Sequence, residues 1–141
     1  MRTISQIIVH CSATPQGREV EVEQIRKWHL ERGWSDIGYH YVIDLQGNIH
    51  EGRKEEKIGA HTKGLNKNSI GICYIGGLDS KLEPLDTRTD EQINALEDLL
   101  KVLKRKYPSA TIHGHNDFSS KACPSYDATD EYDWISERDF S

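Results

Sequence analysis

The sequence predicts an α/β fold in a single domain that spans residues 1–141. Two observations lead to this prediction. The chain has the length of one ordinary domain, which is too short for two separate hydrophobic cores. Short apolar segments rich in β-formers also alternate with two segments of helical periodicity, without an internal repeat or a low-complexity stretch. Segments mixed in this way favour a sheet with helices packed on its faces.

The clearest helix is expected after residue 89. Thr89 and Gln92 have the spacing of a capping box, in which each side chain satisfies a backbone N–H of the other residue. The residues that follow present one apolar stripe at helical spacing, and Pro108 ends the segment.

A second helix is expected from Val22, with Gly33 as its terminator. Apolar side chains recur along this segment at helical spacing. Trp28 and Trp34 lie at its ends, and we expect them to pack there rather than to bind a ligand.

The segments expected to form strands are residues 4–10, 39–52, 69–77 and 110–115. The second of these is typical of a hairpin that turns at residues 46–48. The third is almost continuously apolar, as in a central strand covered on both faces, so Cys73 is expected in the core. Residues 76–90 are expected to form a surface connection.

The composition argues against several classes of protein. The formal net charge is −5, which is the wrong sign for a protein that binds nucleic acid through a basic surface. The apolar stretch at the N-terminus is too short for a signal peptide, and no later segment approaches a membrane span. The three cysteines are odd in number and widely spaced, unlike a disulfide framework. We therefore expect a monomer made in the cytoplasm, with no nucleic-acid or membrane partner.

Side chains from opposite ends of the chain could form a metal site. If residues 110–115 form a strand, His113 and His115 project from the same face, and the loop after them brings Cys123 back toward that face. His10 ends an apolar segment and would emerge at the rim of the sheet, where α/β active sites lie. Imidazole and thiolate suit zinc, and three protein ligands leave one position open for water. The spacing alone also allows histidines that only form structural hydrogen bonds. It allows as well a structural metal site that a fourth ligand closes.

Four ordered motifs resemble a known family: "IIVHCSAT", "GYHYVIDLQGNIHEGR", "IGAHTKGLNKNSIGICYIGG" and "GHNDFSSKACPSYD". Together they resemble the zinc-dependent N-acetylmuramoyl-L-alanine amidases of the short phage lysozyme type, which are related to the peptidoglycan recognition proteins. The resemblance implies a mixed central sheet flanked by helices. It also implies hydrolysis of the amide bond between N-acetylmuramic acid and L-alanine in peptidoglycan.

The resemblance assigns the metal ligands residue by residue. It implies zinc bound by His10, His115 and Cys123, with His113 as a neighbour of the site. A recognition-type relative would bind peptidoglycan without cutting it, and in that branch the cysteine ligand is usually lost. Because this chain keeps Cys123, the resemblance favours the enzyme. A structural zinc protein would need a fourth ligand, for which His113 is the nearest candidate.

The resemblance also implies Tyr39 and Lys121 as the catalytic residues. Negative charge grows on the amide oxygen during hydrolysis, so a cation or a hydroxyl donor aimed at that oxygen lowers the barrier. His40 and His61 match positions near the cleft of the family, where they would contact substrate or support the ligands. The resemblance and the lack of a signal peptide fit an endolysin, which acts on the cell wall after release, and also an effector delivered by a secretion machine.

Overall fold

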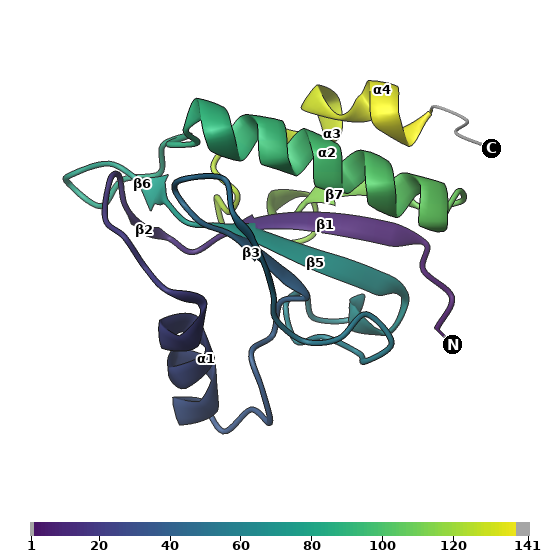
Figure 1. Cartoon of the computed structure of the whole chain (residues 1–141), viewed down its shortest axis with the longest axis horizontal. Helices are drawn as coiled ribbons and strands as arrows, with labels where there is room; N and C mark the ends of the chain where they lie inside the picture. Colours follow the sequence, from purple (N-terminus) through teal and green to yellow (C-terminus); the bar gives the residue numbers. More distant parts are fainter. Residues whose placement is uncertain (1, 138–141) are drawn as a thin grey trace.

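Five strands form the central sheet, in the order β4-β3-β5-β1-β7 (Figure 1). Their bounds are β1 Gln6–Cys11, β3 Tyr41–Ile43, β4 Ile49–Glu51, β5 Ser69–Tyr74 and β7 Thr111–Gly114. Strand β4 is antiparallel to β3, and the other neighbouring strands are parallel. The computed structural model describes residues 2–137. The predicted α/β class and the mixed central sheet are confirmed.

Helices cover both faces of this sheet. Helix α2 (Asp90–Lys106) lies on one face together with the short helices α3 (Ala128–Glu131) and α4 (Asp133–Ser136), and helix α1 (Val22–Glu31) lies on the other side (Figure 1). The predicted capping box begins α2: Thr89 Oγ1 accepts the N–H of Gln92 at 3.1 Å, and Gln92 Oε1 accepts the N–H of Thr89 at 2.9 Å. Among the described residues, no helix is long and apolar enough to cross a bilayer.

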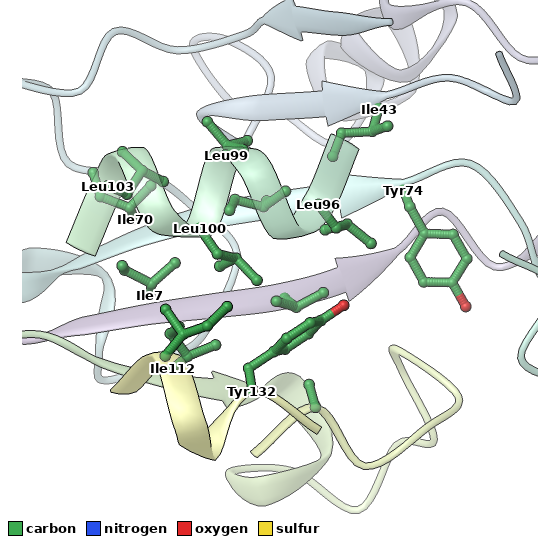
Figure 2. Packing of buried hydrophobic residues seen from close by; sticks show 14 of the residues in the cluster. Ile7, Ile43, Ile70, Tyr74, Leu96, Leu99, Leu100, Leu103, Ile112 and Tyr132 are labelled. Atoms are coloured by element: carbon green, nitrogen blue, oxygen red, sulfur yellow. The ribbon is translucent and has the colours of Figure 1, made fainter. Parts of the chain in front are cut away.

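The larger core lies between the sheet and α2. Figure 2 shows leucines of the helix packed together with isoleucines of three strands: Leu96, Leu99, Leu100 and Leu103 with Ile7, Ile70 and Ile112. Because side chains alternate along a strand, Ile8 and His10 face the opposite side of the sheet, toward α1. Cys73 is fully buried in the smaller core on that side, as predicted. The position of His10 on this face sets the place of the functional site.

The hairpin between β3 and β4 turns where the sequence predicts. Asp44 Oδ1 accepts the backbone N–H groups of Gln46 at 3.0 Å and of Asn48 at 2.9 Å. Gly47 has a φ of 82°, a backbone conformation that residues other than glycine rarely adopt. The turn therefore follows from the side chain of Asp44 and from the glycine.

The segment 76–90 is more than the expected surface connection. Its residues Gly77–Leu78 form β6, which pairs in parallel with β2 (Thr14–Pro15) as a second, two-stranded sheet. Gly77 is buried, and its N–H donates to Thr87 Oγ1 at 2.8 Å. A strand of two residues has no readable periodicity, and the sequence analysis missed β2 and β6 for that reason. The short helices α3 and α4 were missed as well.

Candidate metal centre

The carboxyl ends of two neighbouring parallel strands bring His10 and His115 together. In the pairing of β1 with β7, Val9 lies opposite Gly114, and the residue that follows each of these in the chain is one of the two histidines. Their ring centroids are 4.6 Å apart. His10 is fully buried, whereas His115 begins a short 3-10 helix (His115–Asp117) and is half-buried. The pair lies at the edge of the sheet that α/β enzymes use for their active sites.

The loop after this 3-10 helix returns Cys123 to the end of β1. Its sulfur accepts the backbone N–H of Cys11 at 3.1 Å and lies 3.8 Å from His10 Nδ1. The ligand atoms of His10, His115 and Cys123 all lie within 4.8 Å of one another. Ligand atoms of a tetrahedral zinc site are about 3.3–3.6 Å apart, given the usual zinc–nitrogen and zinc–sulfur bond lengths. The three residues therefore form a candidate metal site.

The electrostatics of the three side chains fit a cation. Burial lowers the pKa of His10 well below its usual value of 6.5, and it lowers the pKa of His115 with help from the nearby charge of Lys121. Both imidazoles are therefore neutral near pH 7 and offer lone pairs. The hydrogen bond with the Cys11 thiol and burial raise the pKa of Cys123, so a neighbouring cation is needed to hold this sulfur as a thiolate.

His113 lies outside this group. It sits on β7 opposite Ile8, with Nε2 2.7 Å from Thr111 Oγ1 and Nδ1 3.6 Å from a carboxylate oxygen of Asp117. Its ring also packs edge-on against Phe118. Within residues 2–137, His10, His115 and Cys123 form the one group of three or more such side chains that could hold a metal ion, so the fourth ligand required by a structural site is not supplied there.

A cavity of about 320 Å³ lies over the candidate ligands, and both Tyr39 and Lys121 line it. A neighbouring cavity of about 540 Å³ shares His115 and Lys121 with it. Among the described residues that line the two cavities, none is an aspartate or a glutamate, while Arg32 and Lys63 add further positive charge. The cavities are thus a cationic region of a chain whose net charge is −5.

Tyr39 and Lys121, which both line the first cavity, carry two different hydrogen-bond donors. The ring of Tyr39 lies 5.2 Å from the ring of His10, and burial raises the pKa of its hydroxyl well above 10. Tyr39 therefore keeps its proton at neutral pH. Lys121 is exposed, and its positive charge contributes to the lowered pKa values of both His10 and His115. Its ammonium group thus lies near the candidate ligands.

The structure places His40 beneath the cavities rather than in them. Its side chain is fully buried, and its ring nitrogens bond to backbone groups: Nδ1 accepts the N–H of Gly71 at 3.0 Å, and Nε2 donates to the carbonyl of Lys57 at 2.8 Å. Burial lowers the pKa of His40 to about 4, which keeps the ring neutral. Of the two roles that the sequence left open, this position fits support of neighbouring residues and not contact with substrate.

His61 lines both cavities and touches a candidate ligand directly. Its Nδ1 lies 2.9 Å from His10 Nε2, and its Nε2 lies 3.2 Å from Ser69 Oγ. Burial lowers the pKa of His61 to about 3, so the ring is neutral. The position allows both roles predicted from the sequence, contact with substrate and support of a ligand.

The two tryptophans near α1 do more than pack at its ends. Trp28 packs against the smaller core and Trp34 against the ring of His29, but both also form part of the wall of the 320 Å³ cavity. His29 lines this cavity too, and its ring lies 5.4 Å from that of Tyr39. The position of His29 could have been expected from the sequence, because His29 follows Ile25 by one helical turn and so shares the buried face of the helix.

Similarity to known proteins extends over most of the chain. Residues 1–126 match the family model of N-acetylmuramoyl-L-alanine amidase. The chain is 46% identical over 123 residues to the endolysin of Enterobacteria phage K11, a match that covers 87% of this chain and 82% of the endolysin. It is 32% identical over 130 residues to peptidoglycan-recognition protein SC2 of Drosophila melanogaster, covering 86% of this chain and 68% of that protein.

A solved structure gives the same answer. The endolysin N-acetylmuramoyl-L-alanine amidase LysCS from Clostridium intestinale matches with a TM-score of 0.79 and 28% sequence identity, covering 92% of this chain and 80% of LysCS. Its fold agrees with the mixed sheet and flanking helices described above. With a family model that matches most of the chain and an endolysin relative at 46% identity, the chain belongs to the N-acetylmuramoyl-L-alanine amidase family, and the enzyme class predicted from its motifs is confirmed.

Proposed function

We propose that the protein hydrolyses the amide bond between N-acetylmuramic acid and L-alanine in peptidoglycan, and that His10, His115 and Cys123 hold a zinc ion for this reaction. The observation that carries the proposal is the convergence of two neutral imidazoles and one thiol beside a cationic cavity. Three protein ligands of these types leave one tetrahedral position free, which is typical of a catalytic zinc site. Zinc bound there polarises a carbonyl group and lowers the pKa of water.

Lys121 stabilises the charge that develops on the substrate. When water attacks the amide carbonyl, the carbonyl oxygen becomes negative. Lys121 lines the cavity together with His115 and Cys123. In the proposed reaction its ammonium group donates a hydrogen bond to that oxygen. Because the lysine is charged and the cavity carries no acidic side chain among its described lining residues, no neighbouring carboxylate competes for this donor.

Tyr39 orients the attacking water. Its hydroxyl keeps its proton because burial raises its pKa, so it acts as a fixed hydrogen-bond donor on the wall of the cavity. The contact between its ring and that of His10 holds this donor at a constant place relative to the ligands. Tyr39 and Lys121 therefore divide the work between positioning the water and stabilising the oxyanion.

The enzyme is favoured over a recognition module because the cysteine is in place. A protein that only binds peptidoglycan has no need of the third ligand, yet here the sulfur of Cys123 lies 3.8 Å from His10 Nδ1. We propose that the protein acts as a monomer on the bacterial cell wall, which it reaches after release or delivery. Two kinds of relative support this place of action, a phage endolysin and a peptidoglycan-recognition protein.

Incubation with purified peptidoglycan tests the proposal. We expect new L-alanine amino termini without new reducing sugars, and we expect a chelator to stop their release and added zinc to restore it. Release of reducing sugars would instead show a glycosidase. Sedimentation of the protein with the polymer, without release of soluble fragments, would show a recognition module.

A further inference from the structure

The side chain of His61 contacts Nε2 of His10, whereas the other ring nitrogen, Nδ1, lies near the sulfur of Cys123. We infer that His61 is a positioning residue: its Nδ1 accepts the Nε2–H of His10, and this hydrogen bond holds His10 in the tautomer whose Nδ1 lone pair faces His115 and Cys123. The inference rests on the proposed function, because it concerns the zinc site of the amidase. It replaces contact with substrate as the role of His61.

The argument follows from the proton count of a neutral imidazole, which has one N–H and one lone pair. The Nδ1 atom of His10 lies 3.8 Å from the sulfur of Cys123, so Nδ1 is the atom on the side of the candidate metal. To bind a cation, Nδ1 must be unprotonated, and the proton must then sit on Nε2. At 2.9 Å from that Nε2 lies Nδ1 of His61, which must accept.

The same proton count also determines which nitrogen of His61 carries its proton. If its Nδ1 accepts, its proton is on Nε2, which lies 3.2 Å from Ser69 Oγ, a hydroxyl that can accept it. The chain of hydrogen bonds thus runs from His10 through His61 to Ser69. The opposite tautomer of His61 would donate from Nδ1, leaving the proton of His10 on its metal-facing nitrogen. That arrangement would prevent His10 from binding a cation.

The fold holds the ring of His61 in place for this contact. A Cβ atom on Gly71 would lie 2.6 Å from the ring, and one on Gly59 would lie 2.8 Å from it, so these two glycines provide the space that the ring occupies. The backbone is fixed as well, because Asn66 Oδ1 accepts the N–H groups of both His61 and Thr62 at 2.9 Å. A side chain that only contacted substrate would not need its ring to be packed against Gly71 of β5.

Thr62 offers the one competing contact that the structure shows for His10 Nε2. Its Oγ1 lies 3.3 Å from His10 Nε2 and 3.0 Å from His61 Nδ1. The longer distance to His10 makes it the weaker acceptor of the two. Since His61 Nδ1 has a single lone pair, which accepts the Nε2–H of His10, Thr62 Oγ1 takes only the weaker share of the same N–H.

Zinc affinity tests the inference without reference to catalysis. We expect His61→Ala to weaken zinc binding about 10- to 100-fold, the usual cost of losing a partner of a metal-bound histidine. His61→Asn keeps an acceptor oxygen close to the position of Nδ1 and should recover affinity to within about threefold of the wild type. Competition with a chromogenic zinc chelator measures each constant. His50→Ala is the matched control, because His50 pairs with Asp44 on the distant hairpin.

Nitrogen NMR of the unmutated protein gives a second readout that does not depend on whether a variant folds. In the zinc-loaded protein we expect the proton of His10 on Nε2 and the proton of His61 also on Nε2. A proton on Nδ1 of His61 would overturn the inference, and so would unchanged zinc affinity in His61→Ala. Loss of affinity in Thr62→Val but not in His61→Ala would identify Thr62 as the acceptor and would also overturn it. If the unmutated protein binds no zinc, the proposed function fails, which is a different outcome.

Discussion

The Nδ1 atom of His10 lies 3.8 Å from the sulfur of Cys123, although 113 positions separate the two residues along the chain. A metal ion bound between them joins the first strand of the sheet to the loop after the last. Because the unfolded chain does not hold these atoms together, binding energy at this site is also folding energy. The proposed zinc site therefore predicts that metal content, stability and activity of the protein are linked.

Removal of zinc should destabilise the fold. A ligand that binds only the folded state adds about 2.7 kcal/mol to the free energy of unfolding when its free concentration is about 100 times its Kd. We expect the thermal unfolding midpoint to rise with added zinc and to fall when a chelator is present. Differential scanning calorimetry measures both. Identical midpoints with zinc and with chelator would contradict binding by the folded protein.

Cys123→Ser should abolish turnover of peptidoglycan and strongly reduce zinc content, because a hydroxyl does not replace the thiolate as a ligand. Cys73→Ser is the matched control. Cys73 is fully buried on β5 and is not one of the candidate ligands, so its substitution should lower stability but leave zinc bound. Elemental analysis and a peptidoglycan release assay compare the two. Equal loss of zinc in two folded variants would argue against the ligand assignment.

Lys121→Ala should leave zinc content unchanged and slow amide cleavage about 100- to 1,000-fold, the usual cost of losing one oxyanion donor. Lys81→Ala removes the same charge from an exposed position in the loop before α2 and should keep wild-type activity. Initial rates on soluble muramyl peptides, with zinc measured in the same samples, separate the two effects. A wild-type rate in Lys121→Ala would remove this residue from the proposed mechanism.

Tyr39→Phe should also reduce the rate, while the zinc affinity stays close to that of the wild type. The substitution removes only the hydroxyl and keeps the ring that packs against His10. Since the hydroxyl is proposed to orient water, the loss should appear in kcat and not in KM. Steady-state kinetics on the same soluble substrate test this. An increase in KM alone would show that Tyr39 binds substrate instead.

Stability should fall as the pH drops from about 6.5 toward 4, in part because of His40. Burial holds its pKa at about 4 in the folded state, against 6.5 for an ordinary histidine, so between these values the unfolded chain binds a proton that the folded chain does not. The loss is at most about 3–4 kcal/mol, because the pKa difference is about 2.5 units at ~1.4 kcal/mol per unit. Urea unfolding at several pH values, with chelator present, measures it. His40→Ala should be less stable at pH 7 and should show a flatter pH dependence; a slope as steep as that of the wild type would exclude His40 as the cause.

Local sequence features predicted the regular elements. The capping box at Thr89 begins α2, and the apolar segment around Cys73 forms the buried strand β5. These features act over a few residues, through hydrogen bonds of the cap and through burial on both faces of a strand. The pair β2 and β6 was missed because each has only two residues and depends on a partner distant in the chain.

The sequence by itself determined the family, the α/β class and the types of side chain available for a metal. Spacing alone left both His113 and His115 open as ligands, the family resemblance selected His115, and the role of His61 stayed open. The tertiary structure provides the contacts that bear on both points. The register of β7 on β1 places His115 beside His10. Packing of the His61 ring against Gly71 brings that ring to His10 Nε2. The reason is physical: such contacts join residues far apart in the chain, and only the folding of the sheet determines which of them meet.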